Sequence, residues 1–415
     1  MSEVLEKASR ARKAYQTYFP STEEKNGLLT KVAKALVNRA EEILKANEED
    51  VKIGRENGTS EALLDRLTLT LPRISQMAEG VLQIVELNDP INQLMSTITK
   101  DNGLVIEKRR VPLGVIGIIY EARPNVTVDA ASLCLKTGNA VVLRGGSAAS
   151  HSNRAIIGIL HDVMAEVGFN VDFLQYIEET DRSSVMEMLK AKEYIDVIIP
   201  RGGRSLIKHV VENSLVPVIE TGEGICHLYI HREANLEMAK NVLINAKCQR
   251  PSVCNAIETL LVDSSFASLH LTELVQELID RNVEVRGCAK TMSLCPKVQI
   301  QALEEDWQTE YSDYILSVKI VSDVGEAVLH IARYGTKHSE SIITDNQEVA
   351  NDFMMKVDAA AVYHNASTRF TDGFEFGFGA EIGISTQKIH ARGPMGLPEL
   401  TSYKYFIKGS GQIRI

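Results

Sequence analysis

Two cysteines in the stretch KCQRPSVCNAIETLLV, residues 247–262, are the side chains whose type and position most favour covalent chemistry. A thiolate is a strong nucleophile, and its formation depends on the pKa of the thiol. Cys248 falls in the last turn of a predicted helix, because Pro251 disfavours helical backbone at Arg250. Helical spacing places Cys248 opposite the apolar face of that helix, near the negative end of the helix dipole, which raises a thiol pKa. Cys254 follows the proline in a predicted loop, so two interpretations stay open for it, a reactive thiol and a buried structural cysteine.

Three glycine-containing segments follow apolar strands and are predicted to precede helices. Glycine lets a backbone approach a ligand closely, and a helix N-terminus offers free N–H groups to phosphate. None of the segments has the G-x-G-x-x-G pattern, so an ordinary Rossmann site is not indicated. Each segment can also be a plain tight connection. They are residues 144–147, 200–204 and 220–224.

The order of the remaining patterns predicts an α/β protein. Residues 1–93 are mostly helical in pattern, with a capping box at Ser21 and Glu24, and residues 94–111 alternate like a β-hairpin. Apolar strands then alternate with amphipathic helices up to about residue 220, which favours a doubly wound parallel sheet. These segments include a helix from about Val128 and a short strand at VPVIE. A second α/β unit is predicted to follow, and the last fifteen residues read as a terminal strand.

Composition excludes several classes of protein. The chain has 415 residues, a net charge of −10 and 44% hydrophobic residues, which is typical of a globular protein without nonspecific affinity for nucleic acid. We find no apolar run that could cross a membrane and no secretory signal at the N-terminus. The six cysteines are too sparse for a disulfide framework, and none has the spacing of a zinc site. The sequence therefore predicts a cytoplasmic protein with reduced thiols.

Several of these segments resemble a known family. SVCNAIETLLV resembles the nucleophile segment of the aldehyde dehydrogenase superfamily, IETGEG its glutamate–glycine segment, and GVIGIIYEARPN with KTGNAVVLRGG its first cofactor segment. More narrowly, YEARPNVT, QRPSVCNA and HIARYGTKHSESII resemble the glutamate-5-semialdehyde dehydrogenase family, and the likeness covers essentially the whole chain. It implies an α/β fold of aldehyde dehydrogenase type, with two doubly wound parallel domains and a small β extension for oligomerisation. The implied boundaries are 1–93 and 112–220 for a dinucleotide-binding domain, 221–399 for a catalytic domain, and 94–111 and 400–415 for the oligomerisation hairpin and terminal strand.

The resemblance implies an oxidoreductase of proline biosynthesis. It would use NADPH to reduce L-glutamyl 5-phosphate to L-glutamate 5-semialdehyde and phosphate through a thioester on Cys254. It also implies a homo-oligomer, a dimer or tetramer, and leaves open a transient contact with glutamate 5-kinase. By the same resemblance, the backbone N–H of Cys254 and the amide of Asn125 stabilise the oxyanions. A turn residue after Pro124 is the other interpretation of Asn125.

The resemblance also assigns the cofactor. Arg144 would pair with a 2′-phosphate, unless it is a solvated surface arginine. Glu310 would hold the nicotinamide ribose, unless it is an exposed charge. Glu220 matches a general base that this reaction does not need, and a carboxylate at the domain junction is its other interpretation. The predicted cofactor-binding residues are Arg144, Gly145, Gly146, Ser147, Gly202, Gly203, Glu220 and Glu310.

The phosphate and α-carboxylate of the implied substrate are anions, and arginine side chains are the residues expected to bind them. His338 and Glu340 form an H-x-E pair in a predicted loop, for which a structural or substrate-positioning role is favoured over a metal site. Two rival functions remain. One is an oxidising, NAD-dependent aldehyde dehydrogenase that hydrolyses the thioester with Glu220, and the other is a catalytically silent binding protein. The predicted substrate-binding residues are Arg123, Arg201, Arg250, His338 and Arg392, and no metal is predicted.

Overall fold

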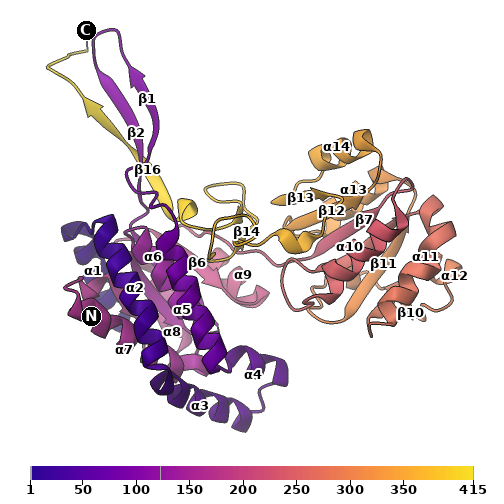
Figure 1. Ribbon diagram of the computed structural model, residues 1–415, viewed down its shortest axis with the longest axis horizontal. Coiled ribbons are helices and arrows are strands. Elements are labelled where there is room, and N and C mark those ends of the chain that lie inside the picture. The colour runs from indigo at the N-terminus through magenta and orange to yellow at the C-terminus, as the bar shows by residue number, and fades with distance from the viewer. Residues whose placement is uncertain (1, 122, 415) are drawn as a thin grey trace. The chain divides into compact units, whose positions relative to one another are not determined.

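The computed structural model describes residues 2–121 and 123–414, which form two compact units (Figure 1). Unit 1 comprises residues 1–221, 377–383 and 395–415, and unit 2 comprises residues 222–376 and 384–394. Residues 377–383 and 395–399 therefore group with unit 1, whereas the boundaries drawn from the sequence gave them to the second domain. None of the described helices is long and apolar enough to span a bilayer.

The N-terminal part of unit 1 is helical, as predicted. The capping box is present, since the Glu24 N–H donates to Ser21 Oγ at 3.2 Å and the Ser21 N–H donates to Glu24 Oε2 at 2.7 Å. Leu29, Val32 and Leu36 lie on one face of the helix that follows and are buried. The helices are α1 (Glu3–Thr17), α2 (Thr22–Asn38), α3 (Ala40–Glu56), α4 (Glu61–Leu67) and α5 (Leu71–Glu86).

A parallel four-stranded sheet, in the order β5-β4-β3-β6, forms the centre of unit 1. Its central strands are fully buried, as their uninterrupted apolar runs predict. Two details of the prediction were wrong. The helix predicted from Val128 begins at Pro124, because proline fits the first helical turn, and VPVIE forms a single bridge, Ile198 to Val218. The elements are β3 (Val115–Tyr120), α6 (Pro124–Lys136), β4 (Ala140–Gly145), η1 (Ser147–Ala149), α7 (Ser150–Glu166), η2 (Val171–Phe173), β5 (Leu174–Tyr176), α8 (Arg182–Lys190), β6 (Val197–Arg201) and α9 (Arg204–Asn213).

The hairpin and the terminal strand pair with each other in unit 1. Strands β1 (Leu94–Thr99), β2 (Val105–Pro112) and β16 (Thr401–Lys408) form an antiparallel sheet with β2 in the middle (Figure 1). Ile106 of β2 faces Ile98 on one side and Ile407 on the other. Segments about three hundred residues apart in the sequence thus share one small sheet. The chain ahead of β16 forms the short helix η5 (Pro398–Leu400).

Unit 2 is built on a seven-stranded sheet in the order β10-β9-β11-β8-β7-β12-β13, in which every pairing is parallel. Leu228 and Ile230 of β7 pack in one apolar cluster with α10 and α11, whereas Tyr229 packs in a second cluster with α13 and α14. Helices therefore cover both faces, and the predicted fold class is confirmed. The elements are β7 (Cys226–Ile230), α10 (Leu236–Cys248), β8 (Ile257–Asp263), α11 (Ser264–Ile279), β9 (Glu284–Gly287), α12 (Ala289–Leu294), β10 (Ile300–Gln301), η3 (Asp306–Gln308), β11 (Ile315–Val321), α13 (Val324–Tyr334), β12 (Ser339–Ile343), α14 (Gln347–Lys356), β13 (Ala361–His364), η4 (Thr368–Phe370), β14 (Ile384–Ser385) and β15 (Gly393–Pro394).

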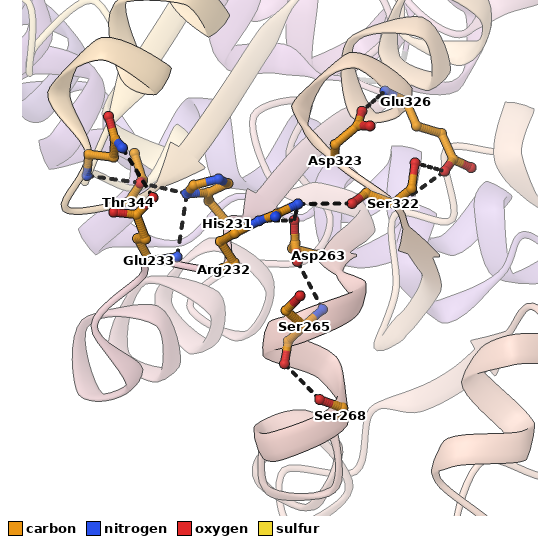
Figure 2. Close-up of polar contacts among 11 residues, drawn as sticks. His231, Arg232, Glu233, Asp263, Ser265, Ser268, Ser322, Asp323, Glu326 and Thr344 are labelled. Carbon is orange, nitrogen blue, oxygen red and sulfur yellow. Dashed lines mark hydrogen bonds and ion pairs between the residues drawn. The ribbon is translucent and has the colours of Figure 1, made fainter.

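The carboxyl ends of these parallel strands carry polar side chains that bond to one another (Figure 2). Asp263, at the end of β8, accepts from the Ser265 N–H at 2.9 Å and pairs with Arg232. Asp323 accepts from the Glu326 N–H at 3.0 Å and so caps α13. Carboxylates of the chain itself thus occupy these helix N-termini, so this edge is a poor place for an anionic ligand.

A buried ion pair joins α10 to β8. Lys247 Nζ lies 2.6 Å from Glu258 Oε2, and both side chains are at most 1% exposed. Glu258 Oε1 also accepts from the Ser312 N–H at 3.1 Å. Burial raises the pKa of Glu258 to about 7, although Lys247 opposes that rise. We expect Lys247→Met to destabilise the protein by roughly 3–5 kcal/mol, because it leaves an uncompensated buried charge.

The deficit of this variant should depend on pH. In the parent, the folded-state pKa of Glu258 lies above its unfolded value near 4.5, so its contribution to stability falls as pH rises from 4.5 to about 7 and then levels off. Without Lys247 the folded-state pKa is higher still, so the loss continues and the deficit widens above pH 7. Urea unfolding of both proteins between about pH 6 and pH 9 measures this. The double variant Lys247→Met/Glu258→Leu should recover most of the loss, and a deficit that shrinks with rising pH would contradict the assignment.

Candidate active site

The cysteine singled out by the sequence lies at the amino edge of the unit 2 sheet. Cys254 is half-buried in a turn that ends just before β8. Because all strands of this sheet run the same way, the segments that precede β7, β11 and β12 meet at the same edge. These segments contain Gly224, Glu310 and His338. The structure therefore gathers several predicted residues at the edge opposite to the one in Figure 2.

The backbone at Gly224 touches the backbone of Cys254. A Cβ at position 224 would lie 1.5 Å from the Cys254 carbonyl oxygen and 2.5 Å from its Cα, so no side chain fits there. The Gly224 N–H donates to Glu310 Oε1 at 3.2 Å. Thr336 Oγ1 donates to the Glu223 carbonyl at 2.5 Å and accepts from the Ile225 N–H at 3.0 Å. The segment that leads into β7 is thus fixed on both sides and supports the Cys254 turn.

A second cysteine, Cys226 at the start of β7, contacts the Cys254 turn. The Cys226 thiol donates to the Cys254 carbonyl at 3.2 Å and lies 3.7 Å from His338 Nδ1. Burial, with the nearby Glu340 and Cys254 charges, raises the pKa of Cys226 well above its ordinary value, so Cys226 stays a thiol. Burial lowers the pKa of His338 to about 4, which keeps its ring neutral at pH 7. His338 is fully buried, and Glu340 lies in the buried strand β12 rather than in the predicted loop.

Cys248 has a different environment. It ends α10, as predicted, but it packs against the core of unit 2 instead of facing away from it. Burial raises the pKa of its thiol, while Arg281 and Lys247 oppose that rise. The direction agrees with the prediction, but the main cause is burial rather than the helix dipole. Because burial makes its thiolate harder to form, Cys248 is a poor nucleophile.

The unit 1 part of the predicted site lies at the N-terminus of α6. Asn125 is in the first turn of this helix, and its Nδ2 donates to Asp129 Oδ2 at 3.2 Å. Burial raises the pKa of Asp129 to about 6, and the Asn125 hydrogen bond and the Arg201 charge oppose that rise. Arg201 also packs against Gly383, where a Cβ would lie 2.2 Å from Nη1. Asn125 is therefore an oriented helix residue rather than a residue of a turn.

The first glycine segment is used for packing. A Cβ on Gly145 would lie 2.3 Å from Asn153 Nδ2, so the glycine permits a close internal contact. Arg144 is 8% exposed, and its Nη2 donates to the Thr180 and Asp181 carbonyls at 2.6 and 2.7 Å. The surface-arginine interpretation was therefore wrong. With Nε also bonded to Ser184 Oγ at 3.3 Å, the guanidinium presents no open two-nitrogen edge for bidentate pairing with a 2′-phosphate.

The other two glycine segments differ from each other. Gly203 is the N-cap residue of α9, and its exposed N–H donates to Glu121 Oε2 at 2.9 Å. A Cβ on Gly203 would meet nothing closer than 3.9 Å, whereas a Cβ on Gly202 would lie 2.7 Å from the Glu121 carboxylate, so Gly203 has open space beside it and Gly202 does not. Residues 220–224 lead into strand β7, so the prediction of a third strand-to-helix junction was wrong.

The remaining predicted residues are more dispersed. Gly146 and Ser147 follow the end of β4, where Gly146 is the N-cap residue of η1 and Ser147 its first residue. Arg123 is the exposed N-cap residue of α6, and Glu220 is half-buried. Arg392 Nη2 pairs with Asp358 at 2.7 Å. Sequence reasoning did not assign roles to Cys226, Thr336, Asn255 or Arg369, which all lie near the Cys254 turn. Asn255 and Thr336 precede strands β8 and β12, and Arg369 follows β13. Their positions next to strands of one parallel sheet were the sequence signal that could have identified them. Among residues 2–121 and 123–414, no group of three or more potential metal ligands occurs.

Comparison with known proteins agrees with this fold. The family model described as "Aldehyde dehydrogenase family" matches residues 1–306. The chain belongs to the aldehyde dehydrogenase family, and it is an oxidoreductase. A crystal structure of an acetylating aldehyde dehydrogenase from Geobacillus thermoglucosidasius has a TM-score of 0.69 at 16% identity and covers 99% of this chain and 97% of its own, which shows the shared fold.

More similar relatives carry a narrower name. The chain is 53% identical to gamma-glutamyl phosphate reductase 1 of Bacillus licheniformis, with both proteins covered completely. It is 55% identical to gamma-glutamyl phosphate reductase of Caldanaerobacter subterraneus subsp. tengcongensis, covering 99% of this chain and 100% of the relative. The crystal structure of gamma-glutamyl phosphate reductase from Thermotoga maritima matches with a TM-score of 0.97 at 49% identity over 100% of each chain.

Proposed function

We propose that this protein reduces L-glutamyl 5-phosphate to L-glutamate 5-semialdehyde and phosphate with NADPH, the second step of proline biosynthesis from glutamate. The observation that carries the proposal is the half-buried Cys254 at the amino edge of the unit 2 sheet, with its backbone held by Gly224 and Cys226. Full-length identity above 50% to enzymes named for this activity supports the choice of substrate. In this proposal unit 1 binds the dinucleotide, unit 2 carries the chemistry, and the three-stranded sheet serves oligomerisation.

The chemistry suits a cysteine. The Cys254 thiolate attacks the acyl carbon, the C–O bond to phosphate breaks, and a thioester forms on Sγ. Hydride addition to the thioester carbon gives a thiohemiacetal, whose collapse releases the aldehyde and restores the thiolate. The Cys254 N–H and the Asn125 amide are the proposed donors to the oxyanions. Because no step consumes water, Glu220 is not required as a base.

The cofactor supplies the hydride when it is bound. The N-terminus of α9 is the proposed pyrophosphate site, because a Cβ on Gly203 would meet nothing closer than 3.9 Å, and the Gly203 N–H, which donates to Glu121 Oε2, would have to exchange that partner for the ligand. Glu310 is the proposed ribose ligand, although its Oε1 also accepts from Gly224. Arg144 does not fit the proposed bidentate contact, so a preference for NADPH over NADH must come from other groups. A cytoplasmic location, the homo-oligomer and contact with glutamate 5-kinase stay predictions.

The reverse reaction tests the proposal. Pyrroline-5-carboxylate, which is the cyclised form of the semialdehyde, is supplied with NADP, and reduced cofactor is followed at 340 nm with and without inorganic phosphate. We expect turnover that requires phosphate, because only phosphate can release the acyl group from Cys254 as the acyl phosphate. Turnover independent of phosphate would instead support the hydrolytic dehydrogenase with Glu220 as base. Cofactor binding without any turnover would support the silent binding protein.

A further inference from the structure

Two guanidinium groups lie beside the Cys254 turn. Arg250 immediately precedes Pro251 at the start of the turn, and Arg369 lies in the short helix η4. Across residues 2–121 and 123–414, neither guanidinium forms an ion pair with a carboxylate. Most other arginines of unit 2 do so, as Arg392 does with Asp358 and Arg281 does with Glu277. The pair is therefore unusual within its own unit.

Hydrogen bonds fasten η4 directly to the residue after the nucleophile. Asn255 Nδ2 donates to the Arg369 carbonyl at 3.3 Å and to the Thr371 carbonyl at 2.9 Å. Thr368 Oγ1 donates in return to the Asn255 carbonyl at 2.7 Å. These contacts hold residue 369 in a fixed position relative to Cys254, although the two are 115 positions apart in the sequence.

The Arg369 side chain runs toward Arg250. Its Nε donates to Gln249 Oε1 at 3.1 Å, and Gln249 is the neighbour of Arg250 in the chain. Burial lowers the pKa of Arg369, the Arg250 charge lowers it further, and negative charge on Cys254 and Asp372 opposes both effects. The Asp372 carboxylate is itself engaged, because it accepts from the Phe374 N–H at 2.9 Å.

Arg369 is half-buried and Arg250 is exposed, and the charge of Arg250 opposes that of Arg369, so an anion bound between them would relieve this repulsion. A guanidinium presents paired N–H donors that match the oxygens of phosphate, and a dianion offsets two positive charges better than a monoanion does. We propose that Arg369 is a substrate-binding residue that, with Arg250, binds the phosphoryl group of the acyl phosphate and, in the reverse direction, inorganic phosphate. This inference rests on the proposed function and adds to it the position of the leaving group.

The amino-acid end of the substrate is the other anionic candidate. Its α-carboxylate carries one negative charge and stands next to an ammonium group, so that end is neutral overall. Two clustered guanidinium groups would repel the ammonium nearly as much as they attract the carboxylate. The phosphoryl group also has to leave from the carbon that Cys254 attacks, which places it beside the nucleophile. Charge and position therefore both favour the phosphoryl group.

Reverse kinetics separate the two anions, because phosphate and the aldehyde are then distinct substrates. We expect Arg369→Gln to raise the KM for phosphate by about 10-fold or more while the KM for pyrroline-5-carboxylate changes less than about two-fold. Arg369→Lys should fall between the parent and Arg369→Gln. Arg281→Gln, an exposed arginine of the same unit that pairs with Glu277, is the matched control and should resemble the parent. A raised KM for the aldehyde with an unchanged KM for phosphate would overturn the assignment.

A second measurement does not need turnover. We expect iodoacetamide to label the half-buried Cys254 thiol, and inorganic phosphate bound beside it to slow the labelling in the parent and in Arg281→Gln but not in Arg369→Gln. If the parent fails the turnover test while phosphate still protects Cys254 through Arg369, the proposed function fails and the anion site stands. If phosphate gives no protection in the parent, the anion site fails whatever the kinetics of the enzyme. Thermal melting of each variant checks that the fold is retained.

Discussion

We expect the replacement of Cys254 by alanine to abolish phosphate-dependent cofactor reduction, with a loss of about 10⁴-fold or more, because the proposed covalent route is lost with the sulfur. The side chain is half-buried in a turn, and Gly224 and the Cys226 thiol both contact the backbone of residue 254, which the substitution leaves in place. The variant should therefore keep its fold and its melting temperature. Initial rates of pyrroline-5-carboxylate oxidation with saturating phosphate measure the loss.

Cys248→Ala is the matched control for this prediction. Cys248 lies in the same sixteen-residue stretch, but it packs against the core at the end of α10 and its pKa is raised by burial. This variant should stay within about two-fold of the parent. If Cys248→Ala lost activity as severely as Cys254→Ala while remaining folded, the assignment of the nucleophile would be wrong.

Gly224→Ala should also inactivate the enzyme, although position 224 carries no reactive group. The added methyl would lie 1.5 Å from the Cys254 carbonyl oxygen, so the two backbone segments must separate. That separation moves the nucleophile and weakens the bond from the Cys226 thiol to the same carbonyl. A displacement of about 1 Å at the reacting atom can cost about 10²-fold in rate, and we expect at least that. The readout is kcat in the reverse reaction, together with the rate at which iodoacetamide labels Cys254.

A glycine in open space provides the comparison. A Cβ at Gly158 of α7 would meet no atom within 4 Å, so Gly158→Ala should leave kcat unchanged and stabilise the helix by up to about 1 kcal/mol. A Gly224→Ala protein with kcat within about three-fold of the parent would mean that the Cys254 turn is not held by this contact.

Much of the architecture could be predicted from local patterns. Uninterrupted apolar runs such as GVIGIIY predict buried parallel strands, and Pro251 correctly separates the helix that ends at Cys248 from the turn that holds Cys254. Local patterns gave the wrong structure where a segment forms a strand only if a neighbouring strand is available to pair with it. VPVIE has the composition of a strand, but it pairs with β6 through one isolated bridge, Ile198 to Val218, instead of a continuous ladder of hydrogen bonds.

The site was less predictable for the same physical reason. An arginine is usually a solvated surface residue, so the sequence does not indicate that Arg144 is buried. Only the fold shows that its guanidinium is buried and bonds to the backbone carbonyls of residues 180 and 181. The glycine pattern at residues 220–224 predicts a close approach to a ligand, whereas Gly224 is required for the close approach to the Cys254 backbone. Arg369 has no local motif, because its position depends on Asn255, more than a hundred residues earlier. Long-range packing creates these features, and a single sequence does not encode that packing in any short window.

The contacts that hold the Cys254 turn also determine when the enzyme becomes competent during folding. The turn is held by residue 224 on one side and by residues 368–371 on the other, so its two sets of contacts span nearly the whole of unit 2. Closing such long loops is slow and becomes favourable only when the sheet between them has formed. A chain still being synthesised therefore carries its cysteine in an unorganised form until most of it has emerged. Catalytic activity should return last in refolding, after helical signal and compactness, and so reports the completed fold.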